Sequence, residues 1–469
     1  MALPGNRGIS FRVLERKFKD WLMLRLSAAM RPQQMPRVPD WASRPHRVLV
    51  LRYDRIGDMI LSTGIIKGIA LAQPTVAIDI LASSGNAVVL AGSPYVASIL
   101  TINRRRPWTW IVALVRMRRA RYDAVIDVMV MAPSLTTMLI MWLSGARHRI
   151  GLGDRGHESA FTLPVARLRD AVHYVDHSAA LLAAFGVDSR SLAKRPAQSD
   201  SAPEASSGRA RIEDTGIGGW GIWRPEIFLT SAEIARGEAR WPRVVPDLGS
   251  TQATIRRLVV NVSAGGAWRY WPSACFIEVL TVVRSMFPGL ECVLIGSPHD
   301  ADRMEDIGRA TGAVVAHTAG VREIMPIIAT SDVVFTADTA VTHIASAFKK
   351  PTVAMYARGK ARLWGPYDVP GRAVSTPGPS LDSLDVASVL PALIEVVAAA
   401  TRTAGNVSAS PVSRASPQTF ERQEATTLAA TRVAELQSRE SIVLQSFQRP
   451  RGSERASRSH SIVGPSDRV

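Results

Sequence analysis

Short apolar runs alternate with helix-like segments along residues 47–188, and this alternation predicts parallel strands with helices between them. Runs such as 47–51 and 122–128 have the length and the β-branched residues of buried strands. The stretch 128–145 has no charged residue, but Pro133 interrupts it. We therefore interpret it as the end of a strand followed by a helix, and not as a membrane span.

A second alternation of similar size runs through residues 226–400. Two such units predict an α/β protein with two Rossmann-like domains that face each other across a central cleft, and ligands are expected at the carboxyl ends of the strands. The expected strands are 47–51, 77–81, 99–101, 122–128, 257–261, 292–295, 313–315, 333–336 and 352–356. The expected helices are 58–70, 86–91, 177–185, 274–286, 302–310, 321–329 and 342–348.

Three segments outside the two units differ in composition. Residues 1–46 are expected to form a basic amphipathic extension, and 189–225 a low-complexity linker of Ser, Ala, Pro, Arg and Gly. Residues 401–469 are expected to be a mostly disordered tail with one helix at 419–447. Within the linker, 216–221 matches G-x-G-x-x-G letter for letter. It follows no predicted strand and opens no predicted helix, so it fails the structural test for a dinucleotide-binding loop.

Apolar residues three and four positions apart place an apolar stripe on one side of a helix within residues 11–30. The stripe consists of Phe11, Leu14, Phe18, Leu22 and Leu26. Arg25 interrupts the apolar core that a signal peptide needs, and no small-residue cleavage site follows. Two interpretations stay open: the helix lies on an anionic membrane surface, or its stripe packs on the protein's own domain.

The charge distribution calls for an anionic partner. The formal net charge is +17 over 469 residues; residues 1–47 carry ten Lys and Arg against three acidic residues, and 104–121 carry seven arginines and no acid. Neither cluster lies in a recognisable nucleic-acid-binding motif, so nucleic acid is not expected as a partner. Cys275 and Cys292 are too few for a disulfide framework or a metal cluster, which fits a reducing cytoplasm.

The stretch 329–356 is interpreted as a strand, a capped helix and a second strand, which together form the right-handed βαβ unit of a parallel sheet. Asp338 and Thr339 are favourable N-capping residues. The start of such a helix has free backbone N–H groups and the positive end of the helix dipole. The amides of Thr339, Ala340 and Val341 are therefore a candidate phosphate site.

Two further loops follow apolar runs in the same way, Arg-Tyr-Asp-Arg-Ile-Gly-Asp at 52–58 and Ser-Ala-Gly-Gly-Ala-Trp-Arg-Tyr-Trp-Pro at 263–272. With 329–356 they resemble the pattern of glycosyltransferase family 9, the heptosyltransferases. In that family an R-x-D-R-x-G-D-type loop follows the first strand, a Gly-rich loop running into K-x-W-P opens the second domain, and D-[TS]-G-x-x-H-x-A lies at the nucleotide site. The resemblance covers about residues 47–188 and 226–400.

The resemblance implies the GT-B fold, with 47–188 as the acceptor-side domain and 226–400 as the nucleotide-sugar-binding domain. It implies inverting transfer of a sugar, heptose by the family name, from a nucleotide-diphosphate donor that is ADP-linked. The acceptor would be a lipid-linked glycan of the lipopolysaccharide-core type or another glycan. The nucleotide-sugar is then a substrate, no cofactor is expected, and the enzyme would be cytoplasmic, on the inner face of the membrane. Neither cleft loop has a D-x-D motif, so no metal is expected.

By resemblance, Asp58 is the base that takes the proton of the acceptor hydroxyl. Arg269 occupies the place of the family's Lys before W-P and would neutralise the diphosphate, while Gly265 and Gly266 would let the backbone approach it. Each of these residues also has a purely structural interpretation. Asp58 would be a carboxylate that favours the helix start, Arg269 a surface arginine, and Gly265 and Gly266 part of a simple turn.

Asp338 and His343 match the family's Asp and His, although His343 fits a helix core equally well. Ala340 departs from the pattern, because the family has Gly there, and a methyl group is tolerated only if the backbone φ is negative. Asp300 lies about where the family has an acidic residue for the ribose hydroxyls.

Two other functions are also compatible with this fold. One is a GT-B nucleotide-sugar epimerase, which the loop at 52–58 disfavours. The other is a non-catalytic, basic membrane- or nucleic-acid-binding protein that retains the fold. The non-catalytic protein and an enzyme are distinguished by one criterion: in an enzyme, Asp58 and Arg269 face one another across a nucleotide-sized cleft.

Overall fold

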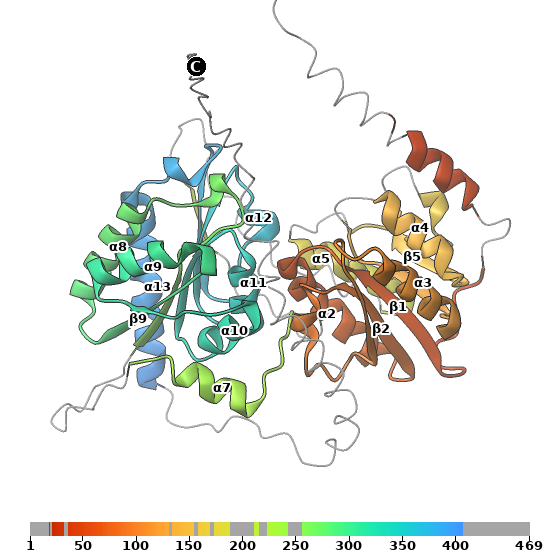
Figure 1. The fold of residues 1–469 in the computed structure, drawn as a ribbon, viewed down its shortest axis with the longest axis horizontal. Coiled ribbons are helices and arrows are strands. Elements are labelled where there is room, and N and C mark those ends of the chain that lie inside the picture. Colours follow the sequence, from red (N-terminus) through yellow and green to blue (C-terminus); the bar gives the residue numbers. More distant parts are fainter. Residues whose placement is uncertain are drawn as a thin grey trace, which may run out of the picture.

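The structure is a computed structural model, and two α/β domains lie side by side in it (Figure 1). The residues described are 18, 21–31, 36–130, 134–153, 158–168, 173–187, 211–214, 223–242 and 256–406. Each domain is built around one sheet with helices on both faces, as the two alternations of apolar runs predict.

The first domain contains a six-stranded sheet of order β3-β2-β1-β4-β5-β6, in which every neighbouring pair is parallel. Its central strands are buried on both faces, because helices cover each side. The strands are β1 (His46–Arg52), β2 (Val76–Ser83), β3 (Ser98–Ile102), β4 (Ala124–Asp127), β5 (His148–Leu152) and β6 (Leu163–Val165).

The two faces of the first sheet have different neighbours. Helix α2 and the α5–η3 segment cover the face toward the second domain, whereas α3 and α4 cover the outer face through a separate apolar cluster (Figure 1). The helices are α2 (Ile56–Ala72), η1 (Ala87–Leu90), α3 (Trp108–Ala120), α4 (Leu135–Ser144), η2 (Glu158–Ala160), α5 (Tyr174–Ala179) and η3 (Ala180–Phe185).

The second domain contains a seven-stranded sheet of order β10-β9-β8-β11-β12-β13-β7. Its neighbours are parallel except for β7, which pairs antiparallel with β13 at the edge. The strands are β7 (Arg211–Asp214), β8 (Arg256–Asn261), β9 (Leu290–Ile295), β10 (Val314–Val315), β11 (Val333–Ala337), β12 (Thr352–Ala357) and β13 (Gly371–Thr376).

Helices flank the second sheet on both sides, and the long α13 packs along α8 and the sheet. Trp271 and Phe276 lie in this core beside Phe335, with ring centroids 4.9 to 6.0 Å apart. The helices are α7 (Ser231–Glu238), η4 (Ala267–Arg269), α8 (Ser273–Met286), η5 (Pro298–Asp300), α9 (Ala301–Thr311), α10 (Val321–Ala329), α11 (Ala340–Ala347), α12 (Ala361–Trp364), η6 (Leu381–Ser383) and α13 (Val386–Asn406).

The domains contact each other where α2 packs on α11. A Cβ atom on Gly57 would lie 2.8 Å from His343 Cδ2, which is closer than packed atoms approach. The first turns of the two helices therefore abut, and only a residue without a side chain fits between them.

A second contact ties α5 to α12 and the loop after it. The ring of Tyr174 stacks on Trp364 with centroids 4.8 Å apart. Tyr367 Oη donates to Asp176 Oδ1 at 2.7 Å. These side chains come from different domains, so they help to set the angle between the two halves of the cleft.

Every strand expected from the sequence lies within a few residues of its expected position. Several other elements differ from the expectation. Residues 86–91 form the 3₁₀ helix η1, and the helix expected at 177–185 begins earlier, at Tyr174. Strand β7 lies inside the segment 189–225, for which the composition predicts a linker. The sequence pattern does not predict the strands β5, β6 and β13, the helices α3, α7, α12 and α13, or the short 3₁₀ helices η2, η4, η5 and η6. The runs 216–221 and 419–447 lie outside the described residues.

Within the N-terminal extension the structure describes residues 18, 21–31 and 36–46, of which 18 and 21–29 are helical. Met23 and Leu26 pack against a small cluster that contains Met138 of α4. Trp21 and Leu24 instead stay about half exposed, at 51% and 56%. Part of this helix therefore packs on its own domain, and part of it faces outward; Phe11 and Leu14 lie outside the described residues. No helix among the described residues is long and apolar enough to cross a bilayer.

Candidate active site

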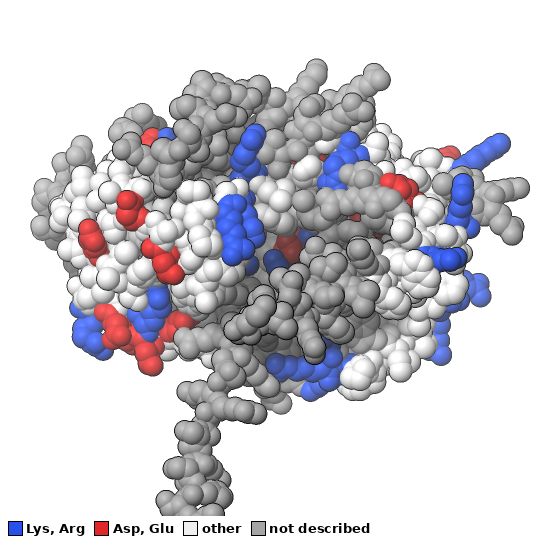
Figure 2. Space-filling model, turned by 90° about the horizontal axis from the view of Figure 1, so that it is seen from above, with Lys and Arg blue, Asp and Glu red and all other residues white. Residues whose placement is uncertain are grey.

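The candidate site is the hollow between the domains. Figure 2 shows Lys and Arg side chains on both sides of it and an acidic side chain deep inside. The loops after β1, β8, β11 and β12 meet here, because the carboxyl ends of parallel strands lie at one edge of each sheet. All three loops that the sequence singled out therefore belong to one region.

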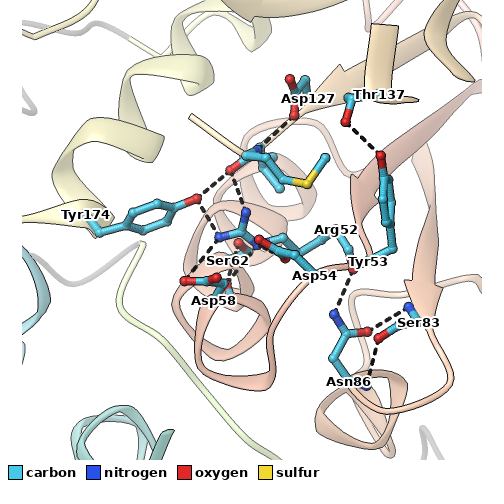
Figure 3. A network of polar contacts seen from close by, with 12 residues as sticks. Arg52, Tyr53, Asp54, Asp58, Ser62, Ser83, Asn86, Asp127, Thr137 and Tyr174 are labelled. Atoms are coloured by element: carbon cyan, nitrogen blue, oxygen red, sulfur yellow. Dashed lines mark hydrogen bonds and ion pairs between the residues drawn. The ribbon is translucent and has the colours of Figure 1, made fainter. Parts of the chain in front are cut away.

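On the side of the first domain, Arg52 organises the loop after β1 (Figure 3). Its guanidinium is 1% exposed and donates from Nη2 to Tyr174 Oη at 2.5 Å and from Nε to the Asp58 carbonyl at 3.1 Å. The carboxylates of Asp54 and Asp58 lie 3.4 and 3.8 Å from it. A buried arginine of this kind needs such partners, because an unpaired buried charge is costly.

Asp58 lies in the first turn of α2, and its side chain is 13% exposed. Burial raises the pKa of its carboxyl group to about 7; Arg52 opposes this shift, and the neighbouring Asp54 adds to it. A carboxylate with a pKa near neutral pH is suited to take up a proton during a reaction. Burial likewise raises the pKa of Asp127, at the end of β4, to about 6.

On the side of the second domain, Arg269 connects two of the predicted loops. Its Nη1 donates to the carbonyl oxygen of Asp338 at 3.1 Å, and its Nε lies 3.8 Å from Asp338 Oδ2. This Nε is buried and has no hydrogen-bond partner among the described residues. Burial raises the pKa of Asp338, while Arg269 and Lys360 oppose that shift.

The start of α11 is fixed by hydroxyl and amide groups. Thr339 is the N-cap, and its Oγ1 accepts from the Val341 amide at 3.2 Å. Asn261 Nδ2 donates to the same Oγ1 at 3.2 Å and to Thr336 Oγ1 at 3.0 Å. The Val341 amide is thus already bonded, and we correct the expectation that three amides point to a ligand: those of Thr339 and Ala340 remain.

Ala340 does not strain the loop. It is the first residue of α11 and is not among the residues with positive φ. The methyl group at this position, where the family has Gly, is therefore compatible with the backbone conformation.

The loop after β12 adds two cations that were not predicted. The guanidinium of Arg269, the guanidinium of Arg358 and the ammonium of Lys360 lie 4.6, 5.2 and 4.9 Å from the centre of the Trp268 ring. Three cations around one ring repel each other, and the ring offsets only part of that repulsion. Such a cluster is suited to a ligand with more than one negative charge.

His343 faces the first domain. It is 6% exposed, its Cδ2 lies against Gly57, and its Nδ1 has no hydrogen-bond partner among the described residues. Burial lowers the pKa of its imidazole to about 3, so the ring is neutral. The neutral ring of His343 thus packs in the contact between the domains and also borders the site.

The remaining predicted residues lie at the edge of the site. Asp300 is 4% exposed and its Oδ2 accepts from Tyr270 Oη at 2.9 Å, which ties it to the loop 263–272. The Gly266 carbonyl accepts from the Arg269 amide at 2.9 Å. Gly266 itself is extended, with φ −176°, and Gly265 precedes it in the same loop.

Arg55 interacts electrostatically with acidic residues on both sides of the site. Arg55 is the N-cap residue of α2; burial raises the pKa of Asp58 in its own domain and of Asp338 in the other, and the charge of Arg55 opposes both shifts. Arg55 thus lies within electrostatic range of an acidic residue in each domain. Within the described ranges, no three His, Cys, Asp or Glu side chains gather where a metal ion could bind.

Sequence reasoning missed Tyr174, Trp364, Arg358 and Lys360. The last two directly follow a correctly predicted strand, so the rule that ligands lie at the carboxyl ends of strands would have found them. Tyr174 reaches the site through its hydrogen bond with Arg52, and Trp364 through the contact between the domains, and neither long-range contact has a local signal in the sequence.

Comparison with known proteins agrees with this arrangement. The family model for glycosyltransferase family 9 (heptosyltransferase) matches residues 112–387, more than half of the chain. No curated protein sequence matches the chain.

Three solved structures share the fold. A family 9 glycosyl transferase from Veillonella parvula has a TM-score of 0.57 at 16% identity, covering 76% of this chain and 98% of its own. ADP-heptose lipopolysaccharide heptosyltransferase II of E. coli has a TM-score of 0.53 at 18% identity, covering 76% and 99%. E. coli heptosyltransferase WaaC with ADP has a TM-score of 0.54 at 16% identity, covering 75% and 99%. The protein is thus a two-domain GT-B glycosyltransferase and belongs to glycosyltransferase family 9.

Proposed function

We propose that the protein transfers a heptose with inversion from an ADP-linked donor to a hydroxyl group of a lipid-linked glycan, of the lipopolysaccharide-core type. The observation that carries the proposal is Asp58, a carboxylate with a raised pKa that borders the same hollow as a cluster of cations. Transfer requires both groups, one for the acceptor proton and one for the departing diphosphate.

In the proposed reaction, Asp58 removes the proton from the acceptor hydroxyl. The oxygen attacks the anomeric carbon from the side opposite the diphosphate, the bond from that carbon to the diphosphate oxygen breaks, and the configuration inverts. Arg52 keeps Asp58 oriented and favours its ionised form, because its guanidinium lies 3.8 Å from the carboxylate.

The leaving diphosphate would lie between Arg269, Arg358 and Lys360 and the start of α11. The cations supply charge, and the amides of Thr339 and Ala340 supply hydrogen bonds at the positive end of the helix dipole. Asp338 and His343 would border the donor, Gly265 and Gly266 would let the backbone approach it, and Asp300 would lie toward the ribose. No metal or cofactor has a part in this scheme.

The choice of donor and acceptor rests on relatives. Two structural neighbours have ADP or an ADP-heptose analogue bound, and another is named for lipopolysaccharide. Because the acceptor is lipid-linked, we place the enzyme at the cytoplasmic face of the inner membrane, held there in part by residues 11–30.

A panel of ADP- and UDP-sugars, read by thermal shift and then by transfer to lipid-linked acceptors, tests the proposal. ADP-heptose should raise the melting temperature most, and the product should have the anomeric configuration opposite to that of the donor. Activity should persist in a chelator such as EDTA. Conversion of the donor without any acceptor would instead indicate an epimerase, and donor binding without any turnover would indicate a non-catalytic protein.

A further inference from the structure

Helix α3 has an unusual outer side. Trp108, Ile111, Val112 and Val115 are 58%, 67%, 43% and 42% exposed. They are spaced three and four residues apart and so form one stripe along the helix, opposite the buried Ala113 and Met117. A surface helix ordinarily places polar residues on this side.

Helix α4 extends this apolar surface. It lies beside α3 on the same face of the sheet, so the outer sides of both helices point away from the sheet in the same direction. Leu139 and Trp142 on its outer side are 36% and 52% exposed. We call the six residues Trp108, Ile111, Val112, Val115, Leu139 and Trp142 the α3–α4 face.

Arginines border the α3–α4 face, with no acidic residue among them. No acid occurs from 104 to 121 or within α4. Arg104 and Arg105 precede α3, and Arg116 and Arg119 lie in its last turns; none of these four forms an ion pair with a described carboxylate. In Figure 2 the outer end of the first domain carries basic side chains with few acidic ones, whereas acidic and basic side chains are mixed at the opposite end.

We propose that the α3–α4 face docks on an anionic lipid bilayer. The Trp, Ile, Val and Leu side chains would enter the boundary between headgroups and acyl chains, and the arginines would pair with lipid phosphates. Charge decides against a second copy of this chain, because a symmetric contact would bring the same arginines together. Nucleic acid would leave the aliphatic stripe exposed to water.

The helices α3 and α4 contact the loop that holds Asp58 through residues outside the face. Tyr53, in that loop, donates or accepts a hydrogen bond with Thr137 of α4 at 2.8 Å. Its ring contacts the edge of Trp110 of α3, with centroids 5.8 Å apart. Docking would therefore bring the loop 52–58 close to the bilayer, where a lipid-linked acceptor is presented.

The test measures binding of the full chain to vesicles of phosphatidylcholine with phosphatidylglycerol, and to vesicles of phosphatidylcholine alone. We expect Trp108→Ser/Ile111→Ser to weaken binding to the anionic vesicles roughly tenfold or more, because apolar area is lost. We expect Arg116→Gln/Arg119→Gln to weaken it by roughly tenfold, and to leave binding to the neutral vesicles unchanged.

Matched controls change residues of the same kind elsewhere. Leu71→Ser/Met286→Ser removes two apolar side chains that are each 51% exposed, and Arg236→Gln/Arg240→Gln removes two exposed arginines of the second domain. These variants should bind as the parent does, and thermal unfolding should show that all four variants remain folded.

Unchanged vesicle binding by Trp108→Ser/Ile111→Ser would overturn the proposal. Sedimentation identifies the other occupant: if that variant turns a dimer into a monomer and still binds vesicles, the face joins two copies and the lipid proposal is wrong. Neither result bears on donor binding, which is measured separately without lipid.

Discussion

Helices α2 and α11 begin in the same way, each after a buried parallel strand, and their first turns contact each other at Gly57. The chemistry around the two helix starts is opposite. Helix α2 carries Asp58 in its first turn, beside Arg52 and Asp54. Helix α11 has no acid in its first turn, and Asn261 and Thr339 organise its backbone.

The same backbone unit, a buried strand followed by a helix, serves two different tasks in the two domains. At α2 the positive end of the helix dipole already faces a carboxylate, so this end cannot also receive an anion. At α11 the capping is done by neutral groups, and the cations stand further out around Trp268, which leaves room for a negative ligand. The strand–helix unit sets the position of each site, and the side chains around the helix start determine the charge of the group that binds there.

Removing the carboxylate from α2 should have the largest effect. We expect Asp58→Ala to lower the turnover number at least about a thousandfold, because general base catalysis is lost. Donor affinity should change less than about tenfold, since the base acts on the acceptor. Asp302→Ala removes the corresponding first-turn acid of α9 and should be silent. Steady-state kinetics and donor titration measure both, and an active Asp58→Ala enzyme would remove this residue from the mechanism.

Removing a cation near α11 should have the next largest effect. We expect Arg269→Ala to raise the barrier of the reaction by about 2 to 4 kcal/mol and to weaken donor binding less, because the negative charge grows as the sugar leaves. Arg269→Lys should recover much of the rate, since the charge returns without the planar fork. Steady-state kinetics of both variants, with one donor and a saturating acceptor, measure these changes in rate and donor binding. A silent Arg269→Ala variant would reduce the loop 263–272 to a simple turn.

A side chain at the contact between the two helix starts should cost stability as well as rate. The Cβ of Gly57→Ala would lie 2.8 Å from the buried ring of His343, which must move. We expect a loss of about 1 to 3 kcal/mol in the free energy of unfolding and a slower turnover. Gly320→Ala is the control, because no atom lies within 4 Å of its Cβ and φ is −174°. Equal melting temperatures for the two variants would show that the helices do not abut.

The ionisation of Asp58 should appear in the pH profile of the enzyme. Activity should rise with pH through about 7, where Asp58 ionises. Asp54 raises the pKa of Asp58, so Asp54→Asn should lower it and move the acidic limb of kcat/KM down by about one pH unit. Asp306→Asn, which changes an exposed acid of α9, should leave the limb in place. A limb that stays or moves upward would show that Asp54 does not act on Asp58.

The smallest effect is expected at the start of α11. Ala340→Gly restores the residue that the family has, and it should leave the turnover number unchanged or raise it slightly. The methyl group causes no backbone strain here, as φ is not positive. A large loss of rate would mean that the methyl group itself positions the donor.

The sequence was informative where a local pattern suffices. A buried apolar run followed by a capping residue marks each helix start in the cleft, and the cap at Thr339 and the start of α2 lie within two residues of the expected positions. The polar edge strand β7 and the helix α3 were missed for the same reason. Neither has the apolar and polar alternation that pattern reading needs, since β7 is mostly charged and α3 exposes its apolar residues.

The candidate site could be predicted only in part, because several of its contacts span long stretches of chain. Arg52 was the first letter of a motif, but its partner Tyr174 lies 122 residues away, and Trp364 comes from the other domain. The raised pKa of Asp58 depends on its burial in the folded protein, which the residues around it in the sequence do not reveal. A motif predicts which residue reacts, whereas the tertiary contacts set its proton affinity.

The stack of Tyr174 on Trp364 forms only when the two domains are in contact, so the environment of the site depends on whether the cleft is closed. Tyr174 also accepts a hydrogen bond from Arg52, the neighbour of Asp58, and burial is the main reason why the pKa of Asp58 is raised. If the domains separate, water reaches the carboxyl group and its basicity falls toward that of an ordinary aspartate. We expect the base to gain strength only as the cleft closes around both substrates, so that an open enzyme holding a donor alone is a poor catalyst of its hydrolysis by water.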